Sequence, residues 1–540
     1  MVLPLPGSFW ELVERGAAAR PDARMLLDEE GRCLRFGEFP RVAEQVAAGL
    51  AAGGIAPGDR VSWVLPTGLE ACVLMAALSR LGCVQNPIVP ILGEREVRFI
   101  TEQTGAQHLI VAGKRRTDGG DRDAKGNGAF AAIAAELGFA LLSLDAVGPG
   151  SHGLRLPFAD PADLPEAAES ATGVRWIYYT SGTTADPKGA RHTDASILAC
   201  SNAFAQSGWY REDDLAVVPI PVAHVGGVML LEVCLRTGCA AALVQAFDPV
   251  KTPRFAADLD ATILVGNGAV FQAYLEAQRA VGPAALLPRL RVAANGGSSR
   301  PDSIHDTIRR ELGGAGTMSG WGLTECPAPT AGRIDDTSDQ LALTEGRPAE
   351  GVEVVSVDAS GRTQAPGVEG ELRVRAPQLF QGYVDSSLDA GAFDESGRLR
   401  TGDLGVVEAT GHVRITGRLK DVIIRNGENI SALEIEQALG KVPGVADVAV
   451  IGLPDERTGE RCCAVIQTRD QVAPLSLERV AEHLRELGIS RRKWPEQLER
   501  VEHIPRDGLG KIDKRALRRR IVGSASSDHV ENDTQRRESR

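Results

Sequence analysis

The amino-acid sequence predicts an α/β protein with a large N-terminal domain of parallel α/β sheets, a β-rich subdomain and a small α+β C-terminal domain. Three observations support this fold class. The 540 residues are enough for several domains. Short β-branched runs alternate with helical stretches from about residue 40 to 315, which is typical of parallel sheets covered by helices. Glycine-punctuated β patterns then replace that alternation between about residues 350 and 416.

The alternating region supplies the first set of expected elements. Each expected strand is a short run of β-branched, apolar or aromatic residues, and each expected helix has apolar residues at helical spacing. The expected strands are 61–65, 108–111, 174–179, 215–219, 262–265 and 290–293, and the expected helices are 40–52, 94–102, 196–206, 270–280 and 301–312. Residues 115–128 are charged and rich in glycine, which favours an exposed loop.

The second half of the chain changes character twice. Alternating strand patterns at 352–357, 370–374, 402–408 and 412–416 predict the β-rich subdomain. A compact mixed unit follows, with helices expected at 431–439 and 477–487 and strands at 445–451 and 464–467. We therefore predict an N-terminal domain over 1–419 and a C-terminal domain over 420–522. The polar tail 523–540 is expected to be disordered.

Composition and charge exclude several functional classes. The net charge of −12 argues against nucleic acid as a partner. Nine cysteines without a C-x-x-C pair, and nine histidines without ligand spacing, predict reduced thiols and no zinc site. The most apolar window, 216–235, contains two prolines, His224 and Glu232, so we expect a buried strand–turn–helix and no membrane span. The N-terminus lacks the basic region of a signal peptide, and a cytoplasmic protein is expected.

The stretch YYTSGTTADPKGARH (178–192) has the composition of a phosphate-binding loop. It follows an expected strand and offers backbone N–H groups, hydroxyl groups and one lysine, which together suit an anion. The familiar G-x-x-x-x-G-K-[ST] pattern does not fit, because Lys188 precedes its glycine. A plain loop therefore stays open on this stretch alone.

Four further stretches place charged or aromatic residues beside glycines. They are MSGWGLTEC (318–326), RTGDLG (400–405), GRLKD (417–421) and PRDGLGKIDKR (505–515). Each is weak by itself, but the set in this order, together with the loop at 178–192, resembles the adenylate-forming superfamily, in its acyl-CoA synthetase branch. The resemblance covers about residues 10 to 520.

The resemblance implies roles for these motifs. The loop would wrap the β- and γ-phosphates of ATP, and NGGSS (295–299) would line the adenine and acyl pocket. Trp321, where the family usually has tyrosine, would stack on adenine, Thr324 would touch the α-phosphate, and Glu325 would hold Mg²⁺. The residues so implied for ATP binding are Thr180, Ser181, Gly182, Thr183, Thr184, Lys188, Gly296, Gly297, Ser298, Trp321, Asp403 and Arg418.

The C-terminal domain would be mobile and would rotate about Lys420. Asp403 would accept hydrogen bonds from the ribose, with Arg418 beside it. Lys511 would bridge the carboxylate and the α-phosphate during adenylation, as a catalytic residue with Glu325, Thr324 and His224. Asn426 and Gly427 would serve the second half-reaction.

The implied reaction joins a carboxylic acid to coenzyme A through an acyl-adenylate, using ATP and Mg²⁺. Around His224, the residues Val225, Gly227 and Met318 suggest an apolar pocket for a medium-chain, alicyclic or aryl acid. Val225 stands where amino-acid-activating relatives place an aspartate, which favours an uncharged acyl group. Loading of a carrier protein, a nucleotide-binding pseudoenzyme and a homodimer stay open. Ala185, Ala432 and Asp507 depart from the family pattern without removing a catalytic group.

Overall fold

The computed structural model describes residues 2–112, 115–117, 120–122, 127–144, 149–167, 173–180, 187–297, 303–425, 428–455, 457–469, 475–507 and 511–522. The chain divides into two compact units. The first comprises Met1–Val354, Arg373–Thr401 and Thr410–Val413, and the second comprises Val355–Leu372, Gly402–Ala409 and Arg414–Arg540. The expected domain boundary at Lys420 lies within the second unit and stays a prediction. The expected disordered tail lies outside the described residues.

A nine-stranded sheet forms one half of the first unit, in the order β17-β16-β15-β14-β13-β11-β12-β1-β2. In this sheet the neighbouring strands from β15 across to β1 are parallel. The pairs β1–β2, β15–β16 and β16–β17 are antiparallel. The bounds are β1 (Arg24–Asp28), β2 (Cys33–Arg35), β11 (Leu215–Val218), β12 (Ala240–Leu243), β13 (Ile263–Gly266), β14 (Val292–Asn295), β15 (Thr317–Leu323), β16 (Cys326–Ala331) and β17 (Arg347–Pro348).

A six-stranded sheet forms the other half, in the order β10-β9-β4-β3-β5-β8. It is parallel except for the hairpin β9–β10 at its edge. The bounds are β3 (Arg60–Val64), β4 (Val84–Pro87), β5 (His108–Val111), β8 (Ala140–Ser143), β9 (Val174–Thr180) and β10 (Lys188–Thr193). The two sheets confirm the predicted parallel α/β architecture.

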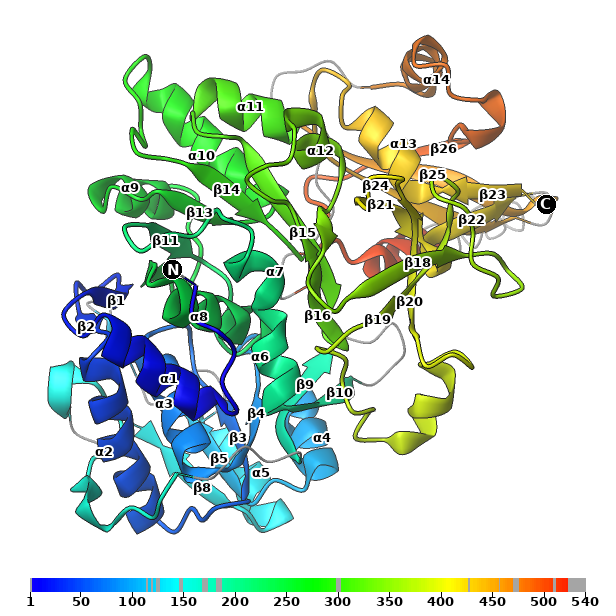
Figure 1. Ribbon diagram of the computed structural model, residues 1–540. Coiled ribbons are helices and arrows are strands. Elements are labelled where there is room, and N and C mark those ends of the chain that lie inside the picture. Colours follow the sequence, from blue (N-terminus) through cyan, green and yellow to red (C-terminus); the bar gives the residue numbers. More distant parts are fainter. Residues whose placement is uncertain are drawn as a thin grey trace. The chain divides into compact units, whose positions relative to one another are not determined.

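Helices cover both sheets (Figure 1). They are α1 (Phe9–Ala19), α2 (Glu38–Ala52), α3 (Leu69–Leu81), α4 (Glu94–Thr104), α5 (Asn127–Leu137), α6 (Asp194–Cys200), α7 (Asn202–Ala205), α8 (Val225–Thr237), α9 (Lys251–Asp258), α10 (Gly268–Val281), α11 (Ile304–Glu311) and α12 (Ser338–Leu343). Two expectations were wrong in detail. The single helix expected at 196–206 is divided at Ser201 into α6 and α7. The loop expected at 115–128 contains the strand pair β6 (Arg115–Thr117) and β7 (Gly120–Arg122) and the start of α5.

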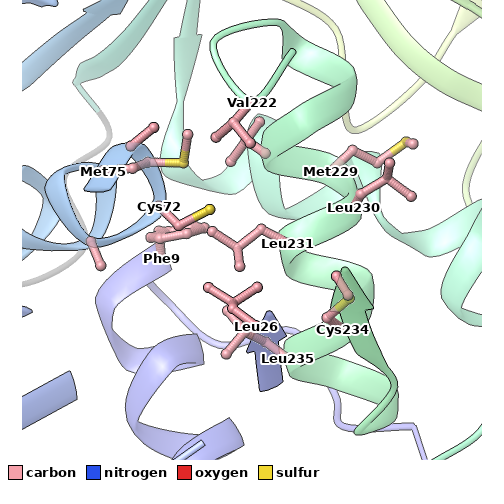
Figure 2. Close-up of a cluster of buried hydrophobic side chains, with 14 of the residues drawn as sticks. Phe9, Leu26, Cys72, Met75, Val222, Met229, Leu230, Leu231, Cys234 and Leu235 are labelled. Carbon is pink, nitrogen blue, oxygen red and sulfur yellow. The ribbon is translucent and has the colours of Figure 1, made fainter. Parts of the chain in front are cut away.

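Helix α8 lies in the centre of the largest hydrophobic core, as expected for the apolar window 216–235. His224 caps its first turn, and Gly238 ends it in the left-handed conformation (φ 76°), which favours glycine. Figure 2 shows the side chains of α8 meeting those of α1, β1 and α3, with Phe9 and Leu26 opposite the helix. No helix in the described ranges is both long and apolar enough to cross a membrane.

One charged residue interrupts this core. Glu232 on α8 is completely buried, and neither of its carboxylate oxygens has a hydrogen-bond partner among the described residues. Burial raises the pKa of this carboxyl group well above its usual value, and the charge of Arg236 only partly opposes the shift. Folding therefore favours the protonated, uncharged form of this carboxyl group.

The remaining strands form two smaller sheets. The first has the order β18-β19-β20-β21, with β18 (Glu353–Val357), β19 (Gly370–Arg375), β20 (Leu399–Val407) and β21 (Val413–Arg418). The second has the order β23-β22-β25-β24, with β26 also paired to β25. It contains β22 (Val422–Arg425), β23 (Glu428–Ser431), β24 (Val445–Asp455), β25 (Gly459–Thr468) and β26 (Gln497–Arg500), covered by α13 (Ala432–Leu439) and α14 (Leu477–Glu486). Ser431 caps α13, so Ala432 occupies the first helical position, where proline is also favoured.

Candidate active site

The carboxyl ends of the parallel strands bring the expected residues of the first unit to one edge of the nine-stranded sheet. His224 follows β11, Gly296 and Gly297 follow β14, and Thr324 follows β15. These strands run in the same direction, so their ends meet at the same edge. In open α/β sheets this edge is where ligands bind.

Thr324 and Glu325 form the two-residue turn between β15 and β16, because Leu323 pairs directly with Cys326. The backbone carbonyl oxygens of both turn residues accept hydrogen bonds. His192 on β10 donates from Nε2 to the Thr324 carbonyl oxygen at 2.8 Å, and the Phe380 N–H donates to the Glu325 carbonyl oxygen at 2.9 Å. His192 is fully buried, and this burial lowers its pKa to about 4, so the imidazole is neutral at physiological pH.

The Glu325 carboxylate has one described partner. Tyr383 donates its hydroxyl hydrogen to Glu325 Oε1 at 2.7 Å, and Oε2 accepts no hydrogen bond from a described residue. In the described ranges no group of three His, Cys, Asp or Glu side chains could hold a metal ion by itself. Mg²⁺ is commonly held by one or two carboxylates together with the phosphates of a substrate. A single half-buried carboxylate therefore fits a magnesium ion that arrives with a nucleotide.

The base of the expected phosphate loop is a hairpin. Thr180 ends β9 and lies directly opposite Lys188, which begins β10. The Lys188 ammonium lies 5.5 Å from the centre of the Tyr383 ring, within the range of a cation–π interaction, and makes no salt bridge with a described residue. Ser181, Gly182, Thr183 and Thr184 lie outside the described residues. The hairpin thus places the Lys188 ammonium beside the Tyr383 ring, and its role in phosphate binding stays a prediction.

The expected adenine residues lie on neighbouring strands. Trp321 on β15 is 8% exposed and pairs with Thr330 on β16. A Cβ atom on Gly322 would lie 2.4 Å from the backbone nitrogen of Ala328, so glycine allows the two strands to approach closely here. Gly297 is exposed with φ 80°, while Ser298 lies outside the described residues. The stacking role of Trp321 stays a prediction.

The expected acyl residues divide into two kinds. His224 is half-buried and accepts a hydrogen bond from the Gly226 N–H on its Nδ1, at 3.1 Å, as the cap of α8. Val225 and Met318 are buried apolar side chains. A Cβ atom on Gly227 would lie 2.5 Å from the Cα atom of Val222. Gly227 therefore has a packing role in this structure, and its role in substrate binding stays a prediction.

The second unit carries the other expected residues. Arg418 contacts Asp403 Oδ1 through Nε at 2.8 Å, and Asp403 is 3% exposed. Lys420 lies in a short 3-10 helix, Leu419–Asp421, after β21. Partial desolvation lowers the pKa of Lys420, and repulsion from Arg418 and Lys511 adds to the shift. Arg418 and Lys511 thus both lie close enough to Lys420 for their charges to act on it, within the same unit.

The loop that carries Lys511 is closed by Asp507. The Asp507 carboxylate accepts a hydrogen bond from the Lys511 N–H at 2.9 Å, and the Asp507 N–H donates to the Lys511 carbonyl oxygen at 2.7 Å. Asp507, which departs from the family pattern, therefore holds the backbone of Lys511 through two hydrogen bonds. Asn426 and Gly427 lie outside the described residues.

Sequence reasoning missed two residues of this site, His192 and Tyr383. His192 belongs to the quoted stretch 178–192, but its partner Thr324 is far away in the sequence. Tyr383 follows a glycine in the run Gln381-Gly382-Tyr383, and the sequence carries no sign of its contact with Glu325. Only the fold brings these side chains to the site.

Comparisons with known families agree with this geometry. The sequence model described as "AMP-binding enzyme" matches residues 13–384, and the one described as "AMP-binding enzyme C-terminal domain" matches residues 434–511. The medium-chain fatty-acid–CoA ligase of Escherichia coli K12 is 30% identical over 535 residues, which cover 97% of this chain and 91% of that protein. The long-chain-fatty-acid–CoA ligase FadD13 of Mycobacterium tuberculosis H37Rv is 31% identical over 488 residues, covering 90% and 92%.

Two solved structures illustrate the similarity in fold. ATP-bound MatB from Rhodopseudomonas palustris has a TM-score of 0.82 at 25% identity, covering 94% of this chain and 98% of that one. A fatty acyl CoA synthetase from Mycobacterium tuberculosis has a TM-score of 0.72 at 27% identity, covering 96% and 99%.

Proposed function

The chain belongs to the AMP-binding enzyme family, in the acyl-CoA synthetase branch of the adenylate-forming superfamily, and we propose that it joins an uncharged medium-chain, alicyclic or aryl carboxylic acid to coenzyme A. In the first half-reaction, a carboxylate oxygen attacks the α-phosphorus of ATP and pyrophosphate leaves. In the second, the thiol of coenzyme A attacks the acyl carbon, loses its proton, and AMP leaves. Adenylation is needed because a free carboxylate is a poor acyl donor.

One observation carries this proposal: Glu325, in the turn between β15 and β16, and Lys188, at the start of β10, contact the same tyrosine, Tyr383. A carboxylate and an ammonium group that share one tyrosine suit a nucleotide that brings its own Mg²⁺, since each would meet an opposite charge. When bound, Mg²⁺ would offset negative charge on the phosphates. Lys188 would hold the leaving pyrophosphate, and Glu325 would hold the Mg²⁺ that the nucleotide brings.

The proposed substrate class rests on the burial of the side chains expected to bind the acyl group. Val225 and Met318 are buried and apolar, and α8 begins with an uncharged position beside His224. An ammonium group placed against these side chains would lose hydration without finding a carboxylate, which is unfavourable. An uncharged acyl group loses little on entering such a site, so it is the favoured substrate class. A cytoplasmic location and a homodimer remain predictions.

The test is carboxylate-dependent ATP–pyrophosphate exchange over a panel of acids, with and without coenzyme A. The panel contains straight medium-chain, alicyclic and aryl acids, with an amino acid as the charged control. Exchange with the first three classes, and thioester formation when coenzyme A is added, would support the proposal. Exchange without thioester formation would favour loading of a carrier protein. Nucleotide binding without exchange on any acid would favour a pseudoenzyme.

A further inference from the structure

Tyr383 belongs to a short segment that pairs with β10. The Arg191 N–H donates to the Gly382 carbonyl oxygen at 3.0 Å, the Gln381 N–H donates to the Arg191 carbonyl oxygen at 2.7 Å, and the Val384 N–H donates to the Gly189 carbonyl oxygen at 2.8 Å. Ala190 and Tyr383 therefore lie opposite each other as in an antiparallel pair. The tyrosine is fixed to the same strand that begins with Lys188.

The Tyr383 side chain is also fixed in orientation. It is 8% exposed, and its ring packs edge-on against Phe380, with 4.8 Å between ring centres. Its own N–H donates to Asp389 Oδ1 at 2.7 Å. With backbone and ring both held, the hydroxyl group points at Glu325 and the ring face is presented to Lys188.

We propose that Tyr383 is a positioning residue that holds the Glu325 carboxylate and the Lys188 ammonium in a fixed relation to each other. The proposal rests on the proposed function. Both partners have long, rotatable side chains, and ordering such a chain on binding costs conformational entropy. A partner that orders them beforehand lowers that cost, which is the basis of preorganised sites.

The rival explanation is that Tyr383 only packs in an aromatic cluster with Phe380 and Phe393. Two substitutions separate the explanations. Tyr383→Phe removes the hydrogen bond to Glu325 but keeps the ring over Lys188 and against Phe380. Tyr383→Leu removes the hydrogen bond and the ring together.

The experiment measures ATP binding by isothermal titration calorimetry, once with Mg²⁺ and once with EDTA. Tyr383→Phe should weaken binding of MgATP about tenfold, the effect of one hydrogen bond to a charged group, and leave binding of metal-free ATP within about twofold. Tyr383→Leu should weaken both, because the Lys188 contact is lost as well. In the Glu325→Gln background, Tyr383→Phe should have little further effect, since the hydroxyl acts through that carboxylate.

Tyr210→Phe is the matched control, because Tyr210 is a buried tyrosine whose hydroxyl has no described hydrogen-bond partner. It should bind MgATP like wild type. If Tyr383→Phe also binds MgATP like wild type, or weakens both forms of ATP equally, the positioning role is overturned while the proposed function stands. If wild type binds no ATP, the proposed function fails, and the positioning role fails with it. Tyr383→Phe retains the packed ring, so the test does not depend on whether Tyr383→Leu folds.

Discussion

Glu232→Gln should change how the stability of the protein depends on pH. Glu232 is buried on α8 without a hydrogen-bond partner among the described residues, and its pKa is raised well above 4.5, chiefly by burial. The groups whose charges face it are Arg236, which favours ionisation, and Asp194, which opposes it. Glutamine has nearly the same shape and no charge at any pH.

The sign of the effect follows from linkage. Above the unfolded-state pKa, Glu232 loses its proton in the unfolded chain but keeps it in the folded one, so rising pH favours unfolding. Each pH unit in this window lowers the unfolding free energy by about 1.4 kcal/mol. At pH 7.5, wild type should therefore have lost unfolding free energy relative to Glu232→Gln, compared with pH 5.5. The loss begins above the unfolded pKa and ends at the raised folded pKa.

The assay is urea unfolding at both pH values, followed by tryptophan fluorescence. The measured quantity is the difference in unfolding free energy between variant and wild type, and the increase of that difference with pH is the test. Glu14→Gln in α1 is the control, because it removes an equal charge from an exposed position. Parallel pH profiles for wild type and Glu232→Gln would refute the reasoning, since they would mean that Glu232 is ionised in the folded state.

Three further substitutions test the roles of other residues. Gly227→Ala should lower the unfolding free energy by about 1–3 kcal/mol in urea unfolding, because its Cβ would lie 2.5 Å from Val222 Cα. Gly226→Ala is the control and should cost less, because its Cβ would come no closer than 3.3 Å to a side chain, that of His224, instead of to backbone. Lys511→Ala should abolish pyrophosphate exchange but spare thioester formation from a supplied acyl-adenylate, and equal loss of both would contradict the assignment. Lys420→Pro, which fixes φ near −65°, should keep adenylation and lose thioester formation in the same paired assays; Lys420→Ala removes only the charge, and wild-type behaviour of the proline variant would place the hinge elsewhere.

Local sequence patterns predicted those strands and helices whose bounds depend on residues within the segment itself. The expected strand 108–111 has the bounds of β5, and the expected helix 94–102 is α4 without its last two residues. Apolar spacing and flanking glycines lie within the segment itself, so they can be read without the fold. The division of the expected helix at Ser201 could not be foreseen, because the Ser201 hydroxyl accepts a hydrogen bond from Arg236 on α8.

The candidate site shows the same limit. The resemblance indicated Glu325 and Lys188 from their motifs, but their common partner Tyr383 comes from a segment with no motif of its own. Gly227 is predicted to contact the substrate because of its neighbours, and only the fold shows that an added Cβ atom would meet the backbone of Pro221 and Val222. A motif identifies the type of group present, and three-dimensional packing decides what that group contacts.

The pairing of residues 381–384 with β10 also determines where the first unit can be cut. β10 is the outermost strand of the six-stranded sheet, and Gln381, Gly382 and Val384 occupy backbone groups on its outer side. A fragment that ends before Gln381 would expose those groups as a bare sheet edge, which is a template for aggregation. A fragment that extends beyond Val384 keeps the edge covered. Solubility of truncated versions should therefore change sharply across these four residues, although the nine-stranded sheet and its helices are complete well before them.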